Sequence, residues 1–198
     1  MTTSTSTTTS TSLTTGSSMT TGTSMTASSS MTGAPGTTRP DLRIVPVPAA
    51  TLRRLREQGY DDFGIPWTVV PGAPGRPVRC CLRRTTPDER VVLISYAPVH
   101  HAAFTDRTAP YNEVGPIFVH AEECEGYVED GGFPSAWREA PQVLRAYAPD
   151  GEILDGVLTQ PDEDRLAIAA DLLREPGVAF VHSRCVGPGC FAFEIRRA

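Results

Sequence analysis

The segment VAFVHSRCVGPGCFAFEIR, residues 178–196, decides the predicted fold because it has the pattern of a β-hairpin. Apolar and aromatic residues alternate along both arms, and the central Val-Gly-Pro-Gly favours a tight turn between them. With a four-residue loop, we expect Cys185 to lie opposite Cys190 and His182 to lie opposite Phe193. His182 then belongs to a strongly apolar face, where burial keeps its ring neutral.

Outward from this hairpin, the sequence predicts further antiparallel strands and two helices. Gly and Pro interrupt the apolar runs at short intervals, which is typical of hairpin connections. Strands are expected at residues 43–47, 67–70, 78–84, 90–96, 116–120, 142–147 and 152–158, and helices at 49–58 and 161–174. The predicted fold class is therefore α+β, a mostly antiparallel hairpin-built sheet with one long and one short helix.

The composition divides the chain into two parts. Residues 1–38 carry no charge and consist almost entirely of Ser and Thr, with all 4 methionines of the protein among them. Such a segment has too little apolar surface to offset chain entropy, so a disordered low-complexity tail is expected. It also has no basic region followed by an apolar run, so we do not expect it to act as a signal peptide. Residues 39–198 are expected to form a single globular domain.

Charge and cysteine content restrict the partners and the compartment. All 18 basic residues are arginine, which excludes lysine Schiff-base chemistry, and the net charge of −5 comes with no basic stripe. We therefore expect no nucleic acid and no membrane partner, but a small-molecule substrate. The 5 cysteines without an export signal favour a cytoplasmic protein with reduced thiols.

Histidines and cysteines lie at or near the ends of the predicted strands, and these side chains suit proton transfer and thiolate attack. The leading hypothesis is a small enzyme with a His/Cys-lined pocket, in which a histidine is the general base and a cysteine is the nucleophile. Its candidate catalytic residues are His120, His182, Cys81, Tyr111 and Cys190.

The second hypothesis is a zinc-binding protein, because Cys and His are the usual zinc ligands. Its candidate ligands are His120, Cys124, His182 and Cys190. Three glutamates surround Cys124 and are expected to raise the pKa of its thiol, unless a metal stabilises the thiolate. A third hypothesis is a non-catalytic small-molecule-binding or scaffold domain, in which these residues belong to the core and the surface.

Two further groups of residues support weaker predictions. Cys80 and Cys81 are neighbours on the predicted strand 78–84, so they should point to opposite faces, with Arg79 on the face of Cys81. A cation there would lower the pKa of the Cys81 thiol. His100, His101 and Asp106 lie in a predicted loop at 97–115, which could form a lid, although exposed loop polarity is the favoured explanation.

Several segments together resemble a bacterial family catalogued as domain of unknown function family 1203. The similar segments are residues 79–83, 91–96, 110–121, 144–147, 181–182 and 189–191. The resemblance extends over residues 41–197, and its most specific part is the segment that ends in His120. Members of this family often have a cysteine where Val78 stands, so a site that needs that thiol would be incomplete here. The resemblance implies no activity and no catalytic residues.

Overall fold

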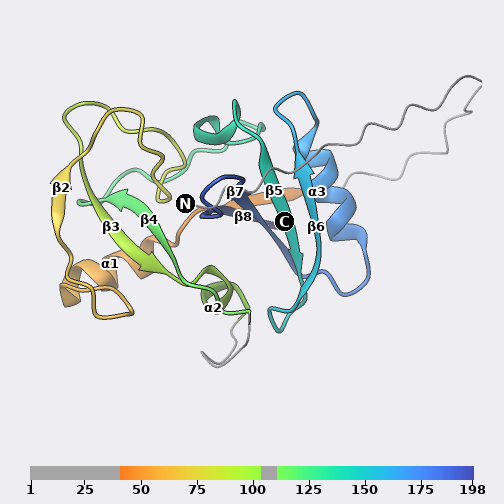
Figure 1. The fold of residues 1–198 in the computed structure, drawn as a ribbon, viewed down its shortest axis with the longest axis horizontal. Helices are drawn as coiled ribbons and strands as arrows, with labels where there is room; N and C mark the ends of the chain where they lie inside the picture. Colours follow the sequence, from red (N-terminus) through yellow and green to blue (C-terminus); the bar gives the residue numbers. More distant parts are fainter. Residues whose placement is uncertain (1–40, 104–110) are drawn as a thin grey trace, which may run out of the picture. The chain divides into compact units, whose positions relative to one another are not determined.

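The larger of two sheets has five antiparallel strands in the order β1-β8-β7-β5-β6 (Figure 1). The computed structural model describes residues 41–103 and 111–198, and the predicted tail at 1–38 lies outside this range, as does Asp106. The strands of this sheet are β1 Leu42–Val45, β5 Gln142–Tyr147, β6 Ile153–Thr159, β7 Phe180–Cys185 and β8 Phe191–Arg197. Each of these strands was predicted within a few residues of its observed bounds.

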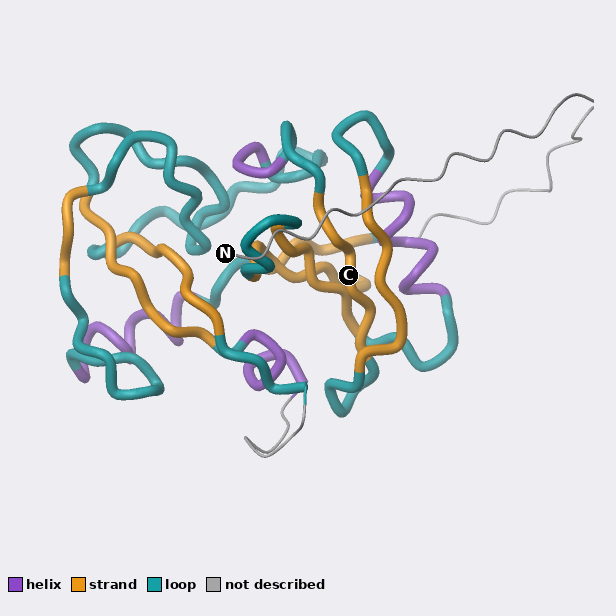
Figure 2. The backbone as a smooth tube through the Cα atoms, viewed as in Figure 1, coloured by secondary structure: helices purple, strands orange, loops and turns teal. Residues whose placement is uncertain are grey.

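The smaller sheet has three antiparallel strands, β2 Val69–Pro71, β3 Arg90–Tyr96 and β4 Gly115–His120, in that order. Figure 2 shows the two groups of strands with the helices and long loops beside them. The helices are α1 Ala49–Gln58, α2 Pro98–Ala103, the 3-10 helix Ser135–Trp137 and α3 Arg165–Arg174. The α+β prediction is confirmed, but α1 and α3 are equally long at ten residues each.

Both longer helices form where local sequence signals place their ends. α1 has the predicted bounds, buries Leu52 and Leu55, and ends at Gly59, whose φ of 77° suits a residue without a side chain. α3 begins four residues later than predicted, because the Asp164 side chain accepts a hydrogen bond from Ala167 N at 3.0 Å and caps the helix there. Both helices thereby bury an apolar face.

The β7–β8 hairpin has a different register from the predicted one. His182 lies opposite Glu194, and Phe193 lies opposite Ser183, because the pairing shifts between Ser183 and Arg184. A bulge of this kind inserts one extra residue on one strand and moves the following side chains to the other face. The prediction that His182 lies opposite Phe193 was therefore wrong.

The segment 78–84 is a turn and not the predicted strand. Val78 N donates to Arg83 O at 3.0 Å, which closes a short loop, and Leu82 has a φ of 55°. A positive φ at a non-glycine residue is incompatible with an extended strand and is rarely adopted without support from the surrounding fold. Leu82 is 1% exposed, so the core holds its side chain in this position.

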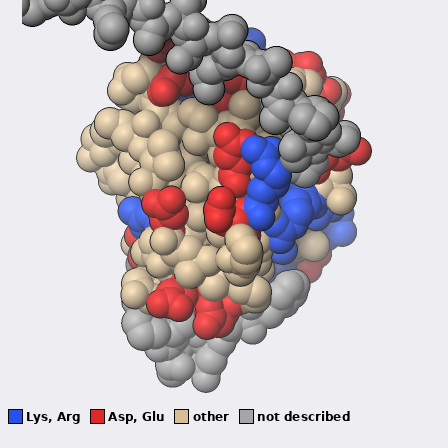
Figure 3. Space-filling model, turned by 90° about the vertical axis from the view of Figure 1, so that its right-hand side faces the viewer, with Lys and Arg blue, Asp and Glu red and all other residues tan. Residues whose placement is uncertain are grey.

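The surface of the domain is mixed in charge on the face that carries α3. Figure 3 shows acidic and basic side chains close to one another on this face, with uncharged areas beside them. Asp171 and Arg174 form an ion pair within α3. Among residues 41–103 and 111–198, no helix has both the length and the apolar character that crossing a bilayer requires.

Candidate metal centre

The turn at 78–84 determines where two adjacent cysteines point. Arg79 N donates to Phe118 O of β4 at 2.9 Å, and Arg79 O accepts from Val47 N at 2.9 Å. These two bonds fix the backbone immediately before Cys80. In a turn, consecutive side chains need not alternate as they do in a strand. Cys80 and Cys81 therefore both reach the same histidine, which corrects the prediction that they face opposite ways.

Strand β4 delivers that histidine, as its sequence predicts. It pairs with β3 along its whole length, and His120 at its end lies opposite Val91. Ile117 and Val119 anchor the strand in the core, at 1% and 0% exposure. The backbone N–H of His120 donates to Cys80 Sγ at 3.3 Å. The last residue of β4 thus contacts the turn through both its backbone and its ring.

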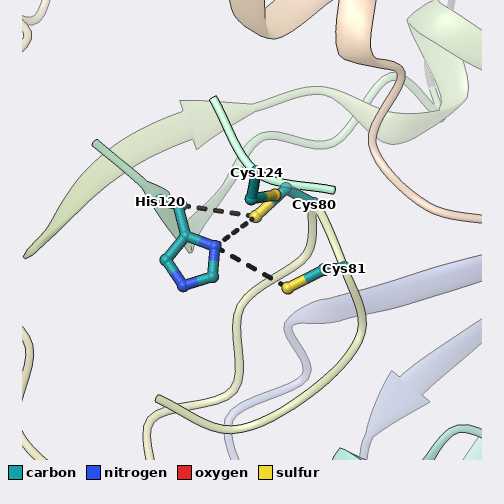
Figure 4. A group of neighbouring side chains, drawn as sticks. All are labelled: Cys80, Cys81, His120 and Cys124. Carbon is teal, nitrogen blue, oxygen red and sulfur yellow. Dashed lines mark hydrogen bonds between the residues drawn. The ribbon is translucent and has the colours of Figure 1, made fainter. Parts of the chain in front are cut away.

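Three thiols surround the ring of His120 (Figure 4). Its Nδ1 atom lies 3.3 Å from Cys80 Sγ and 3.7 Å from Cys81 Sγ. Cys124 completes the group, and the four ligand atoms all lie within 4.8 Å of one another. Cys80, Cys81 and His120 are buried, whereas Cys124 is partly exposed. We call these four residues the thiol–imidazole cluster.

Arg56 of α1 holds the backbone that joins His120 to Cys124. Its Nε atom donates to Ala121 O at 3.0 Å, and its Nη2 atom donates to His120 O at 3.2 Å and to Glu122 O at 2.9 Å. A guanidinium bound to three successive carbonyls restrains the chain where regular strand pairing ends. The helix thereby helps to position Cys124, which no strand carries.

Hydrogen bonds within the thiol–imidazole cluster shift the pKa values of its groups. A hydrogen bond from Cys80 lowers the pKa of Cys81 against the opposing effect of burial, and Arg83 contributes to the lowering. Contact with Cys80 also raises the pKa of His120 to about 9. The pKa of Cys124 rises to about 12, because of its hydrogen bond with Cys80 and then its burial. The upward shift was predicted, but its causes are these contacts and not the neighbouring glutamates.

Arg83, and not Arg79, is the cation beside Cys81. The Arg79 side chain turns away and donates from Nε to Phe191 O at 2.9 Å. Arg83 instead binds Glu89, with Nη1–Oε2 and Nη2–Oε1 distances of 3.0 and 2.5 Å. This pairing lowers the pKa of the Glu89 carboxyl to about 2. A nearby cation lowers the pKa of the Cys81 thiol, as predicted, but this cation is Arg83 and the prediction of Arg79 was wrong.

A pocket of about 240 Å³ reaches the cluster from the surface. His120 and Cys124 are in its lining, together with charged residues of both signs that include Arg83, Glu89 and Glu122. The Nε2 atom of His120 makes no hydrogen bond with the described part of the chain and lies 3.5 Å from Glu89 Oε1. The Nδ1 atom of His120 thus contacts sulfur, while its Nε2 atom faces a carboxylate.

His182 lies in the larger sheet, apart from the thiol–imidazole cluster. It is 0% exposed, and its Nε2 atom lies 3.3 Å from Glu194 Oε2. The rings of Tyr147, Phe180 and Phe191 surround it at centroid distances of 4.7 to 5.0 Å. The two histidines belong to strands of different sheets, and His182 is not among the four residues whose ligand atoms lie within 4.8 Å of one another.

Two other predicted residues also lie outside the thiol–imidazole cluster. Cys190 stands at the tip of the last hairpin, where its Sγ atom lies 3.7 Å from Pro188 O. Tyr111 is 42% exposed.

In the loop predicted as a lid, residues 98–103 form α2, and His101 binds Asp62 at 3.2 Å. Conversely, Cys80 belongs to the cluster although neither candidate set contained it; its position next to Cys81 was the available signal.

Fold and centre together define an α+β protein with a buried group of three thiols and one imidazole. The chain belongs to the family described as "Protein of unknown function (DUF1203)", which it matches over residues 75–197. This range contains the whole cluster and begins after α1 and Arg56. Val78 is 0% exposed, and the cluster has four ligand groups without a thiol at this position. Neither the curated proteins nor the solved structures include a match.

Acid should destabilise the fold through His182. Burial lowers its pKa, so the folded ring stays neutral, whereas the unfolded ring takes up a proton below pH ~6.5. The unfolded state then binds more protons, and stability should fall by about 1 kcal/mol for each pH unit below this value. Urea unfolding between pH 6.5 and 5 measures the slope. The variant His182→Gln, which keeps a hydrogen-bond donor for Glu194, should reduce this dependence of stability on pH. An unchanged slope would contradict this account.

Proposed function

We propose that the protein binds a zinc ion at Cys80, Cys81, His120 and Cys124. The observation that carries this proposal is the convergence of three sulfur atoms and one imidazole nitrogen within 4.8 Å. Three cysteines and one histidine are a common ligand set of structural zinc sites, whereas hard cations prefer oxygen. No carboxylate belongs to the group, which favours a soft or borderline metal.

The distances in the cluster suit a tetrahedral ion. Zinc bonds of about 2.3 Å to sulfur and about 2.05 Å to nitrogen place neighbouring ligand atoms about 3.6 to 3.8 Å apart. The distances from His120 Nδ1 to Cys80 Sγ and Cys81 Sγ are 3.3 and 3.7 Å. Small side-chain rotations would bring the longest separation, 4.8 Å, into this range. The fold therefore supplies a cage of suitable size.

The electrostatics also support a metal. Contact with Cys80 and burial raise the pKa of Cys124 to about 12, so this thiol holds its proton when no cation is near. A divalent cation reverses this effect, because it binds the thiolates and releases their protons. With four ligands from the protein, the ion would have a structural role and would tie the turn at 78–84 to the end of β4 and the following loop.

A thiol-dependent enzyme is the second candidate, and one observation favours it. The pKa of Cys81 is lowered by Cys80 against the effect of burial, and the 240 Å³ pocket extends to His120. In this proposal Cys81 is the nucleophile and His120 exchanges its proton. This proposal gives no role to His182, Cys190 and Tyr111, because they lie outside the thiol–imidazole cluster.

Tag-free protein purified without chelators should contain one zinc ion per chain. Cys80→Ser and Cys124→Ser should each lose most of it, because oxygen is a poor replacement for a thiolate ligand. Elemental analysis by mass spectrometry measures zinc, copper and iron together. Cys190→Ser is the matched control and should keep its zinc. Wild-type protein without stoichiometric metal, even after zinc addition and dialysis, would refute the proposal.

Glu89 should strengthen zinc binding without touching the ion. A carboxylate that accepts the second ring N–H of a ligating histidine fixes its tautomer and raises its basicity. Glu89→Gln should therefore weaken zinc affinity by about 10- to 100-fold, measured by competition with a chromophoric chelator. Glu122→Gln, in the same pocket but paired with Arg90, is the control. Equal affinities of the two variants would show that Glu89 has no such role.

Alkylation rates distinguish the two candidates. In metal-free protein, Cys81 should react with iodoacetamide at pH 7 faster than Cys124, because its pKa is lowered while that of Cys124 is about 12. Zinc should suppress both reactions, as measured by peptide mass spectrometry. If Cys81 reacts equally fast with and without added zinc, it is no metal ligand, and the enzyme proposal gains support.

A further inference from the structure

A second cavity, of about 230 Å³, lies beside the β1–β8 edge of the larger sheet. Its polar lining comes from Arg43, Glu194 and Arg196, and its apolar lining includes Tyr96, Phe191 and prolines. None of the cluster residues lines it. Neither the zinc proposal nor the thiol proposal gives this cavity a role.

Two arginines face each other across this edge of the sheet. β1 pairs with β8 so that Arg43 lies directly opposite Arg196 and Val45 lies opposite Glu194. Residues two apart on a strand share a face, so all four side chains are on the same side. Like charges directly opposite each other are destabilising in an antiparallel pair. The register therefore places two positive charges side by side, and a bound anion would reduce their repulsion.

Glu194 offsets the charge of Arg196, with which it forms an ion pair, but it forms none with Arg43. It is 6% exposed, with Oε2 lying 3.3 Å from His182 Nε2 and Oε1 accepting a hydrogen bond from Arg196 Nε. Arg196 also donates from Nη2 to Ala102 O at 2.7 Å, which holds its guanidinium in place. The side chain of Arg43 makes no hydrogen bond or ion pair with any residue that the structure describes. One positive charge at the rim is thus left uncompensated.

The rest of the wall is flat and apolar. The rings of Tyr96 and His101 stack with centroids 4.7 Å apart and planes inclined by 6°. His101 is bound to Asp62 through its Nε2 atom, at 3.2 Å, and so keeps its ring in this position. Phe191 packs against Tyr96 at 5.6 Å. A planar apolar group would find contact surface here, next to the arginines.

From these observations, we propose that this cavity binds a small organic carboxylate, with its charged end at Arg43 and Arg196 and its apolar body against Tyr96 and His101. Arginine binds carboxylates through two parallel hydrogen bonds, which suits the open fork of Arg43. The volume sets an upper size, because cavities for drug-sized molecules are typically larger than about 300 Å³. A ligand with one ring and one carboxylate is therefore the appropriate class.

Benzoate and benzylamine are matched probes, alike in shape and opposite in charge. Each is titrated into the full chain while amide signals are followed by two-dimensional NMR. Benzoate should bind with roughly millimolar affinity, as expected for so small a ligand, and shift the amides of Tyr96, Ala102 and Phe191. Benzylamine should cause no saturable shift at these positions.

Arg43→Gln should weaken benzoate binding roughly tenfold, since it removes a charged hydrogen-bond donor. Arg174→Gln, which removes another exposed arginine, on α3, is the control and should leave the affinity unchanged. Both variants should keep the zinc content of the wild type, so this test is independent of the thiol–imidazole cluster. Three results would each overturn the proposal: preferential binding of benzylamine, equal affinities of the two variants, or no saturable shift with benzoate.

Discussion

Arg79 is the residue on which the arrangement of the core depends. Its backbone bonds Phe118 of β4 and Val47 before α1, while its side chain donates to Phe191 O of the larger sheet. Arg79 is 4% exposed, and its Cζ atom lies 5.3 Å from the ring centroid of Trp137. A buried cation is costly unless its donors are satisfied, so these bonds strongly favour one position of the turn. The two cysteines that follow are placed by this constraint.

Local patterns in the sequence were sufficient for most elements. β3 and α1 were predicted with their observed bounds, because alternation in one and the Gly59 stop in the other are local signals. The β7–β8 register was not readable, since a bulge depends on which side chains the rest of the sheet accepts. Residues 78–84 were predicted as a strand because they form an apolar run, and their true conformation also depends on tertiary contacts. Their apolar character is real, but tertiary hydrogen bonds and a positive φ at Leu82 make them a turn.

The candidate site was predicted in part. His120, Cys81 and Cys124 were among the candidates and the structure brings them together, because β4 ends where the turn approaches it. Cys80 was missed as a consequence of the strand assignment, which sent neighbouring side chains to opposite faces. His182 was included because its hairpin is strongly apolar. Which sheet that hairpin joins is a long-range property, and the sequence pattern of one hairpin does not contain it.

Both proposed sites hold like groups close together before any ligand arrives. In one, crowding by Cys80 and burial raise the pKa of Cys124; in the other, strand register sets Arg43 opposite Arg196. The surrounding fold maintains each arrangement. Arg56 does this in the first case, through three backbone carbonyls, and the β1–β8 ladder does it in the second. At each proposed site a ligand would meet groups that are already positioned, so little of its binding free energy would be spent on ordering the chain.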